Sequence, residues 1–257
     1  MRYYLCELFR ELSTEWLKRT NRVTNYAALI DQIWRHTPND ERVALVTFNY
    51  DLLLDTALQS LSYNPQNDLE RHFDAHPRLK LFKPHGSVNW SRFTDHPAGT
   101  RRQPFQLIQE AYTFNLSDKY VVAAAATDPH QFFNYEWPIV PAIAIPVQTK
   151  DEDTFEWPRS HRVYLEELLP SVTKILIIGW QAKEAHFSQM LRDKLPMRGR
   201  AVAHFLVVGK DAEDGKAILH RFASELGQSG YNTNHRYSNG GFSQFVANQE
   251  GEAFFRA

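Results

Sequence analysis

The sequence predicts an α/β fold with a mostly parallel sheet, and two observations lead to this prediction. Four short apolar runs have the length of a buried strand, and each ends at a polar residue or a glycine: 43–48, 79–83, 174–178 and 203–208. Segments with helical spacing of apolar residues lie between them. Because strands that alternate with helices form doubly wound parallel sheets, we expect one central sheet with helices on both faces.

Composition narrows the class of protein. The chain has 257 residues, of which 43% are apolar and 23% charged, and its net charge is −1. This is typical of a globular protein and indicates no general attraction to nucleic acid or anionic membranes. The single cysteine, Cys6, excludes an intrachain disulfide framework and a cysteine-only zinc site. Charges at Glu7 and Arg10 argue against a signal peptide, so we expect a cytoplasmic location.

The remaining elements follow from periodicity and from proline or glycine boundaries. The first helix, expected over 3–19, carries an apolar stripe of Leu5, Leu8, Leu12 and Trp16. The segment 139–145 contains Pro141, which predicts an edge strand or an extended loop. Further helices are expected at 26–36, 52–61, 161–169, 185–194, 212–226 and 242–247, and a further strand at 120–126.

Polar side chains follow the first predicted strand. Asn49 and Asp51 stand where the strand gives way to a helix. Open α/β sheets bind ligands at the carboxyl ends of their strands, which makes both residues site candidates. Asn and Asp are also favoured at helix N-termini for local reasons, so a helix cap is an equal alternative.

The second predicted strand ends in a histidine followed by a glycine. His85 precedes Gly86, and glycine permits a tight turn and the close approach of a ligand to the backbone. A single histidine is usually structural. At the end of a strand, in a chain with another polar strand end, it becomes a candidate for acid–base chemistry.

Together these stretches resemble the sirtuin-like (silent information regulator-like) superfamily. The run 47–51, Thr-Phe-Asn-Tyr-Asp, resembles the family motif Thr-x-Asn-x-Asp, and 85–87, His-Gly-Ser, resembles its His-Gly motif. The run 83–90 is especially similar to the prokaryotic branch found in anti-phage defence proteins. The resemblance implies a Rossmann-like α/β fold and a single domain over 1–257. This domain would be incomplete at its N-terminus, with an irregular insertion at 91–137 that is either a cap over the site or a surface excursion.

The resemblance also implies a chemistry. NAD would be the substrate, His85 the base, Asn49 the residue that orients the ribose or the attacking water, and Asp51 a contact of the nicotinamide carboxamide. Water as nucleophile gives NAD hydrolysis, whereas an acetyl-lysine oxygen gives deacetylation. Sirtuin deacetylases carry a cysteine zinc module in the region that lacks cysteine here, so we expect no zinc, and its absence favours hydrolysis.

A third match is less complete. The strand at 175–179 and its Gly179 agree with a family motif of strand and Gly-x-Ser, but Gln181 replaces the serine and His186 stands where a carboxylate is expected. After the next strand, Gly209 occupies a position where many sirtuins have asparagine. Under the resemblance, Gly179, Gln181 and Gly209 would contact the nucleotide.

The largest departure lies upstream, because no glycine precedes Gly86. A dinucleotide site of this class needs a glycine-rich turn for the pyrophosphate. We therefore expect a truncated domain that binds NAD weakly or not at all by itself and acts as an NAD glycohydrolase when the glycine-rich segment is supplied. The competing hypothesis is a non-catalytic nucleotide-sensing or structural module. Further partners would be a second copy or an effector or sensor protein.

One alternative metal site can be drawn from the histidines. Four of them fall within 25 residues, but they lack the short spacing and supporting carboxylates of a metal site: His72, His76, His85 and His96. We therefore expect no metal there.

Overall fold

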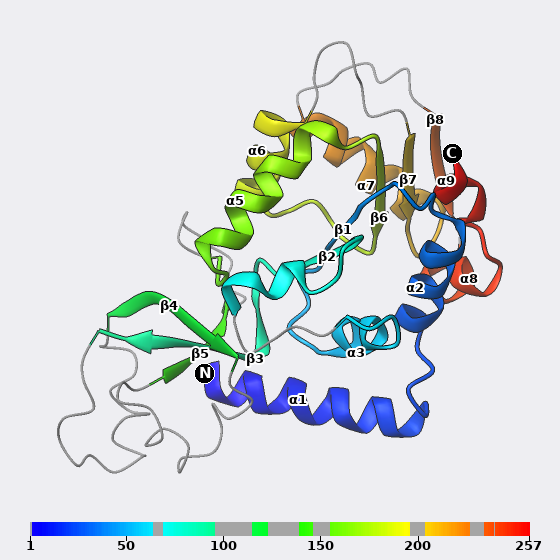
Figure 1. Ribbon diagram of the computed structural model, residues 1–257. Coiled ribbons are helices and arrows are strands. Elements are labelled where there is room, and N and C mark those ends of the chain that lie inside the picture. Colours follow the sequence, from blue (N-terminus) through cyan, green and yellow to red (C-terminus); the bar gives the residue numbers. More distant parts are fainter. Residues whose placement is uncertain are drawn as a thin grey trace. The chain divides into compact units, whose positions relative to one another are not determined.

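The structure is a computed structural model, and it describes residues 2–63, 69–95, 115–122, 139–145, 155–195, 204–226, 234–238 and 240–257 (Figure 1). Its contacts divide the chain into two compact units. Unit 1 comprises Met1–Arg22 and Arg42–Val163, and unit 2 comprises Val23–Glu41 and Tyr164–Ala257. Most of the insertion predicted at 91–137 lies outside the described residues, and the extent of a single domain stays a prediction.

A parallel pair of strands forms the first part of unit 1. Strand β1 (Val43–Val46) pairs with β2 (Leu79–Phe82), in a register that sets Val46 opposite Phe82. All four residues of β2 are buried, which agrees with the apolar run that predicted it. Helix α3 (Leu53–Gln59) and a 3-10 helix, η1 (Leu69–Asp74), lie between the two strands in the chain.

An antiparallel sheet forms the second part of unit 1. Its order is β4 (Leu116–Val122), β3 (Gly86–Thr94), β5 (Ile139–Ile143). The sequence predicted a turn at the start of β3, not a strand. β5 is an edge strand of this sheet, as the proline at position 141 allows, because an edge strand can leave one side of its backbone unpaired.

Helix α1 (Arg2–Arg19) packs on β3 and β5 (Figure 1), but with a different face from the predicted one. Leu12 and Trp16 are 56% and 54% exposed, so the prediction that this half of the apolar stripe is buried is wrong. Cys6 and Ser13 face inward instead, and the Cys6 thiol donates to the Val88 carbonyl at 3.1 Å. Leu5 and Phe9 pack against the same buried cluster as Cys6, so the first half of the helix contributes apolar contacts to the sheet.

Unit 2 is a parallel sheet with helices packed around it. The strands β6 (Lys174–Ile178), β7 (His204–Val208) and β8 (Asn234–Ser238) pair in that order, all parallel. Helices α6 (Ala185–Lys194) and α7 (Ala212–Glu225) pack together, while α2 (Asn25–His36) packs on α8 (Gly241–Ala247) and α9 (Glu252–Arg256) (Figure 1). Helix α5 (Arg159–Leu168) and a short 3-10 helix, Leu169–Ser171, precede β6.

The predicted α/β class with parallel strands is confirmed. Within the described ranges all four predicted parallel strands are present, paired as β1 with β2 in unit 1 and as β6, β7 and β8 in unit 2. The sequence missed β8 and α9. No helix in the described part of the chain has the length and apolar character needed to span a bilayer.

Candidate functional site

The paired strands β1 and β2 bring two predicted site residues to one edge. Val46 lies opposite Phe82 in the parallel register. Asn49 follows Val46 by three positions, and His85 follows Phe82 by three positions. Because parallel strands point the same way, both residues lie beyond the carboxyl edge of the pair, where open α/β sheets bind ligands.

The turn after β1 is held by local hydrogen bonds. The Asn49 amide N–H donates to the Thr47 hydroxyl at 3.2 Å, and the Asn49 side chain is exposed. The Tyr50 hydroxyl donates to the Ala144 carbonyl at 2.6 Å, which ties this turn to the segment after β5. The backbone is therefore fixed while the Asn49 amide group remains accessible to a ligand.

Asp51 has a local structural role. Its carboxylate accepts a hydrogen bond from the Leu53 N–H at 2.9 Å, at the start of α3. Asp51 directly precedes the N-cap residue Leu52, and its oxygen satisfies a donor that the first helical turn leaves free, in agreement with the local role that the sequence left open as an alternative. A contact of Asp51 with a nicotinamide carboxamide stays a prediction.

His85 lies in an aromatic environment at the end of β2 and is 6% exposed. Its ring centroid lies 4.9 Å from that of Phe48 and 6.2 Å from those of Tyr50 and Phe155. The His85 carbonyl accepts from the Ala144 N–H at 2.8 Å. The ring is thus shielded by apolar surfaces next to the turn that carries Asn49.

The glycine of the His-Gly pair is a structural requirement. Gly86 has φ +81°, in the left-handed region that glycine adopts readily. A Cβ at this position would lie 1.8 Å from the Ala142 carbonyl oxygen. Any larger residue would push β3 away from β5 and displace His85.

Sequence reasoning missed a residue that joins both turns. The Lys83 ammonium group is completely buried and donates to the Asp51 carbonyl at 2.6 Å, the Ser87 hydroxyl at 2.7 Å and the Asp55 carboxylate at 2.9 Å. A lysine at the end of a strand usually indicates a solvated strand end, and its partners are up to 32 positions away in the chain. No local pattern identifies this interaction.

The other three predicted residues lie in unit 2, at the carboxyl ends of β6 and β7. Gly179 has φ +64°, and no described atom lies within 4 Å of the position of a Cβ. This open space suits a ligand that approaches the backbone closely. A Cβ on Gly209 would lie 2.4 Å from the Gly215 nitrogen, so this glycine is needed for the packing of α7 on β7.

Gln181 is engaged within unit 2. Its side-chain oxygen accepts from the Arg221 guanidinium group at 3.3 Å, and its backbone carbonyl accepts from the same group. The structure therefore places Asn49, Asp51 and His85 together in unit 1, and Gly179, Gln181 and Gly209 at adjacent strand ends in unit 2.

Two of the histidines that were considered for a metal site make structural contacts instead. His76 accepts backbone N–H bonds from Arg78 and Leu79, both at 3.1 Å, and His72 packs edge-on to Trp90 at a centroid distance of 5.5 Å. His96 lies outside the described residues. Within the described ranges, no group of three or more His, Cys, Asp or Glu residues could hold a metal ion.

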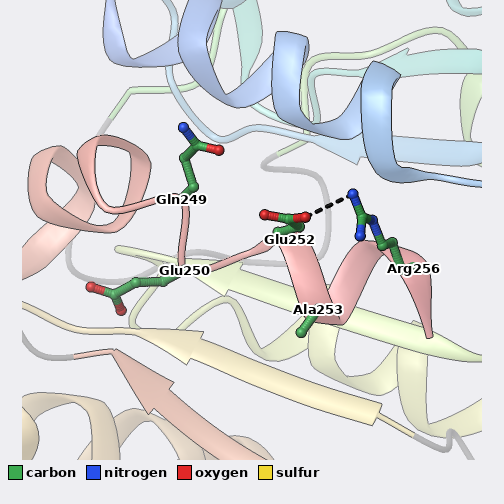
Figure 2. Close-up of a pocket in the computed structure, with 5 residues that line it drawn as sticks. All are labelled: Gln249, Glu250, Glu252, Ala253 and Arg256. Atoms are coloured by element: carbon green, nitrogen blue, oxygen red, sulfur yellow. Dashed lines mark ion pairs between the residues drawn. The ribbon is translucent and has the colours of Figure 1, made fainter.

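A cavity of about 410 Å³ lies beside α9 in unit 2 (Figure 2). Figure 2 labels its five lining residues, Gln249, Glu250, Glu252, Ala253 and Arg256. Glu252 and Arg256 form an ion pair at 2.7 Å across one helical turn. None of the six predicted site residues lines this cavity, so it contributes nothing to the candidate site.

Comparison with known proteins identifies the family of the segment that carries these residues. A search of curated proteins gave no match. The model of the SIR2-like domain family matches residues 43–227, which include both turns of unit 1 and the strand ends of β6 and β7. Because this match covers more than half of the 257 residues, the chain belongs to the SIR2-like domain family.

Proposed function

We propose that this SIR2-like chain hydrolyses NAD to nicotinamide and ADP-ribose. The observation that carries the proposal is the matched placement of Asn49 and His85, each three residues beyond paired positions of two adjacent parallel strands. An accessible amide and a shielded imidazole are the groups needed to bind a ribose and to activate water. Family membership supports NAD as the substrate, since SIR2-like domains in general bind it.

The proposed reaction exchanges one bond for another at the ribose. The bond between the nicotinamide nitrogen and ribose C1′ breaks, and nicotinamide leaves with the bonding electron pair. The water oxygen forms the new bond to C1′, and His85 takes the water proton. The transition state resembles an oxocarbenium ion, as in glycoside hydrolysis, so hydrogen bonds from Asn49 to the ribose or the water would stabilise and orient it.

The proposal includes a role in anti-phage defence, through depletion of NAD. It rests on the run 83–90, which is especially similar to the defence-associated prokaryotic branch. A partner in this role would be a second copy of the chain or an effector or sensor protein.

Two contacts favour a second candidate function, a non-catalytic nucleotide-sensing or structural module. The Asp51 carboxylate is bonded to the start of α3, and the Gln181 side chain is bonded to Arg221. Residues already engaged within the fold contribute less to substrate binding, because those bonds must first be exchanged. A module of this kind would retain the fold and release no nicotinamide.

Nicotinamide release tests the proposal, measured on the chain by itself and with the glycine-rich segment supplied, and with NAD at millimolar concentration because weak binding is expected. His85→Ala removes the base, which is typically worth about 10²–10⁴-fold in rate. Asn49→Ala should slow turnover while the protein stays folded, because the Asn49 side chain is exposed and contributes little packing. Chromatography quantifies nicotinamide and ADP-ribose, and circular dichroism verifies folding.

Asn89→Ala is the matched control. Asn89 lies on β3, and its side-chain oxygen makes no hydrogen bond within the described residues. This variant should cleave NAD at the parent rate. Equal cleavage by folded His85→Ala protein would make His85 a structural residue, and a parent chain that releases no nicotinamide would favour the non-catalytic module.

A further inference from the structure

We propose that Lys83 is the positioning residue of the candidate site: its buried ammonium group holds the turn of Asn49 and Asp51 against the turn of His85 and Ser87. The catalytic consequence of this role rests on the proposed NAD hydrolysis. The geometric role does not, and it can be measured separately.

The three donor contacts of Lys83 reach three different segments. One goes to the Asp51 carbonyl in the turn after β1, one to the Asp55 carboxylate on α3, and one to the Ser87 hydroxyl at the start of β3. An ammonium group has three N–H donors, so each donor has one acceptor. Such a fully satisfied buried charge fixes the distances between all three segments at once.

The contacts continue from Ser87 into the first turn. The Ser87 hydroxyl accepts from Lys83 and donates to the Tyr50 carbonyl at 3.4 Å. The same carbonyl accepts from the Val88 N–H at 3.0 Å. Tyr50 lies between Asn49 and Asp51, and its ring stacks on His85 at 6.2 Å. Lys83 therefore acts on both candidate residues through Tyr50 and Ser87, without reaching the substrate itself.

Strand β2 provides a matched control in Lys80. Its side chain is also buried, and it also donates to one carboxylate, that of Asp74, and to one carbonyl, that of His76. These partners precede β2 in the chain and belong to neither turn. A general requirement for a buried lysine would make Lys80 and Lys83 equivalent, whereas a positioning role makes only Lys83 important for the site.

The experiment compares Lys83→Met with Lys80→Met in the full chain. Folding is followed by thermal denaturation, and site geometry by the NMR signals of the His85 ring and by hydrogen exchange of the Val88 amide. We expect both variants to be less stable. Only Lys83→Met should shift the His85 signals and accelerate exchange at Val88, and it should lower kcat for nicotinamide release about 10²-fold, as displacements near 1 Å do.

Ser87→Ala keeps the test decisive if Lys83→Met does not fold. This variant retains the ion pair of Lys83 with Asp55 and removes the Ser87 hydroxyl, which accepts from Lys83 and donates to the Tyr50 carbonyl. It should shift the same His85 and Val88 signals, and Ser87→Thr should restore them because it retains the hydroxyl.

The outcomes separate the two proposals. If the folded Lys83→Met and Ser87→Ala variants leave the His85 and Val88 signals as they are in Lys80→Met, Lys83 serves stability alone and the positioning role is wrong. If the parent chain releases no nicotinamide, the proposed hydrolysis fails, and the NMR comparison still decides the role of Lys83.

Discussion

The two units differ in what they bury. The ionisable side chains that are buried within the described residues all belong to unit 1: Cys6, Asp55, Tyr63, His72, His76, Lys80, Lys83, His85, Glu156 and His161. The polar side chains buried in the described part of unit 2 are neutral: Thr24, Gln32, Thr37 and Ser188.

This difference indicates two ways of stabilising an α/β structure. Unit 2 relies on apolar packing between its sheet and α7, with Val207, Ile218 and Phe222 at most 1% exposed. Such packing tolerates small changes of shape. Buried charges in unit 1 need good geometry, because the desolvation penalty is offset only when partners are well placed. The unit that carries His85 is therefore the one whose interior is most sensitive to the loss of a single partner.

The largest effect is expected from separating a buried charge pair in unit 1. Asp55→Leu leaves the Lys83 ammonium group without its carboxylate, and loss of one partner of a buried pair costs about 3–5 kcal/mol. The double variant with Lys83→Met should recover part of this loss, because the remaining charge is removed. Urea denaturation of the single and double variants measures the coupling.

The exposed ion pair of Arg19 and Glu15 on α1 is the control for this comparison. Glu15→Gln should change the free energy of unfolding by less than about 1 kcal/mol, since exposed pairs contribute little. A loss as large as that of Asp55→Leu would show that burial is not the cause of the difference.

Acid should weaken unit 1 through its buried histidines. Burial lowers the pKa of His72 from 6.5 to about 4 and that of His161 from 6.5 to about 3. Below pH 6.5 the unfolded chain binds protons that the folded chain does not bind. The free energy of unfolding is therefore highest above pH 6.5 and falls as the pH decreases toward 4, by on the order of 3 kcal/mol for each histidine.

Amide hydrogen exchange at pH 7 and pH 5, corrected for the intrinsic exchange rate, shows whether acid reduces the protection of β2 in unit 1 more than that of β7 in unit 2. His72→Phe should reduce the pH dependence of β2, whereas a change at the exposed His220 of unit 2 should not. An equal loss of protection in β7 would contradict the assignment of the acid sensitivity to unit 1.

The smallest effect is expected in the apolar core of unit 2. Ile218→Val removes one methylene from a completely buried side chain on α7 and should cost about 0.5–1.5 kcal/mol. Because no ionisable group is changed, the loss should be the same at pH 7 and pH 5. Thermal denaturation at both pH values checks this, and a pH-dependent loss would indicate buried charge in unit 2 as well.

Local sequence signals were sufficient for the parallel strands and for most helices. The run 174–178 is a lysine followed by four apolar residues, and it forms β6 with those limits. Helix α6 likewise occupies the predicted 185–194. The sequence also predicted the positions of Asn49 and His85 after their strands, because a polar residue or a histidine after a buried strand can be recognised from the local sequence.

Features that depend on distant partners were not predictable in this way. Strand β3 carries the buried polar residues Ser87, Ser91 and Thr94, and it pairs with β4 on one side and with β5 on the other. Leu12 and Trp16 had the spacing of a core face, but the neighbours of α1 select Cys6 and Ser13. Lys83 has the sequence context of a surface residue, and only tertiary contacts reveal its burial.

The equal offsets of Asn49 and His85 from their paired strands have a consequence for insertions and deletions. One residue of extended chain advances about 3.3 Å, which exceeds the reach of a hydrogen bond. A one-residue insertion or deletion in either turn would displace Asn49 or His85 relative to the other residue, even if every remaining residue were kept. Relatives that share this chemistry should therefore vary in the composition of the two turns before they vary in their length, and engineered insertions should be placed elsewhere in the chain.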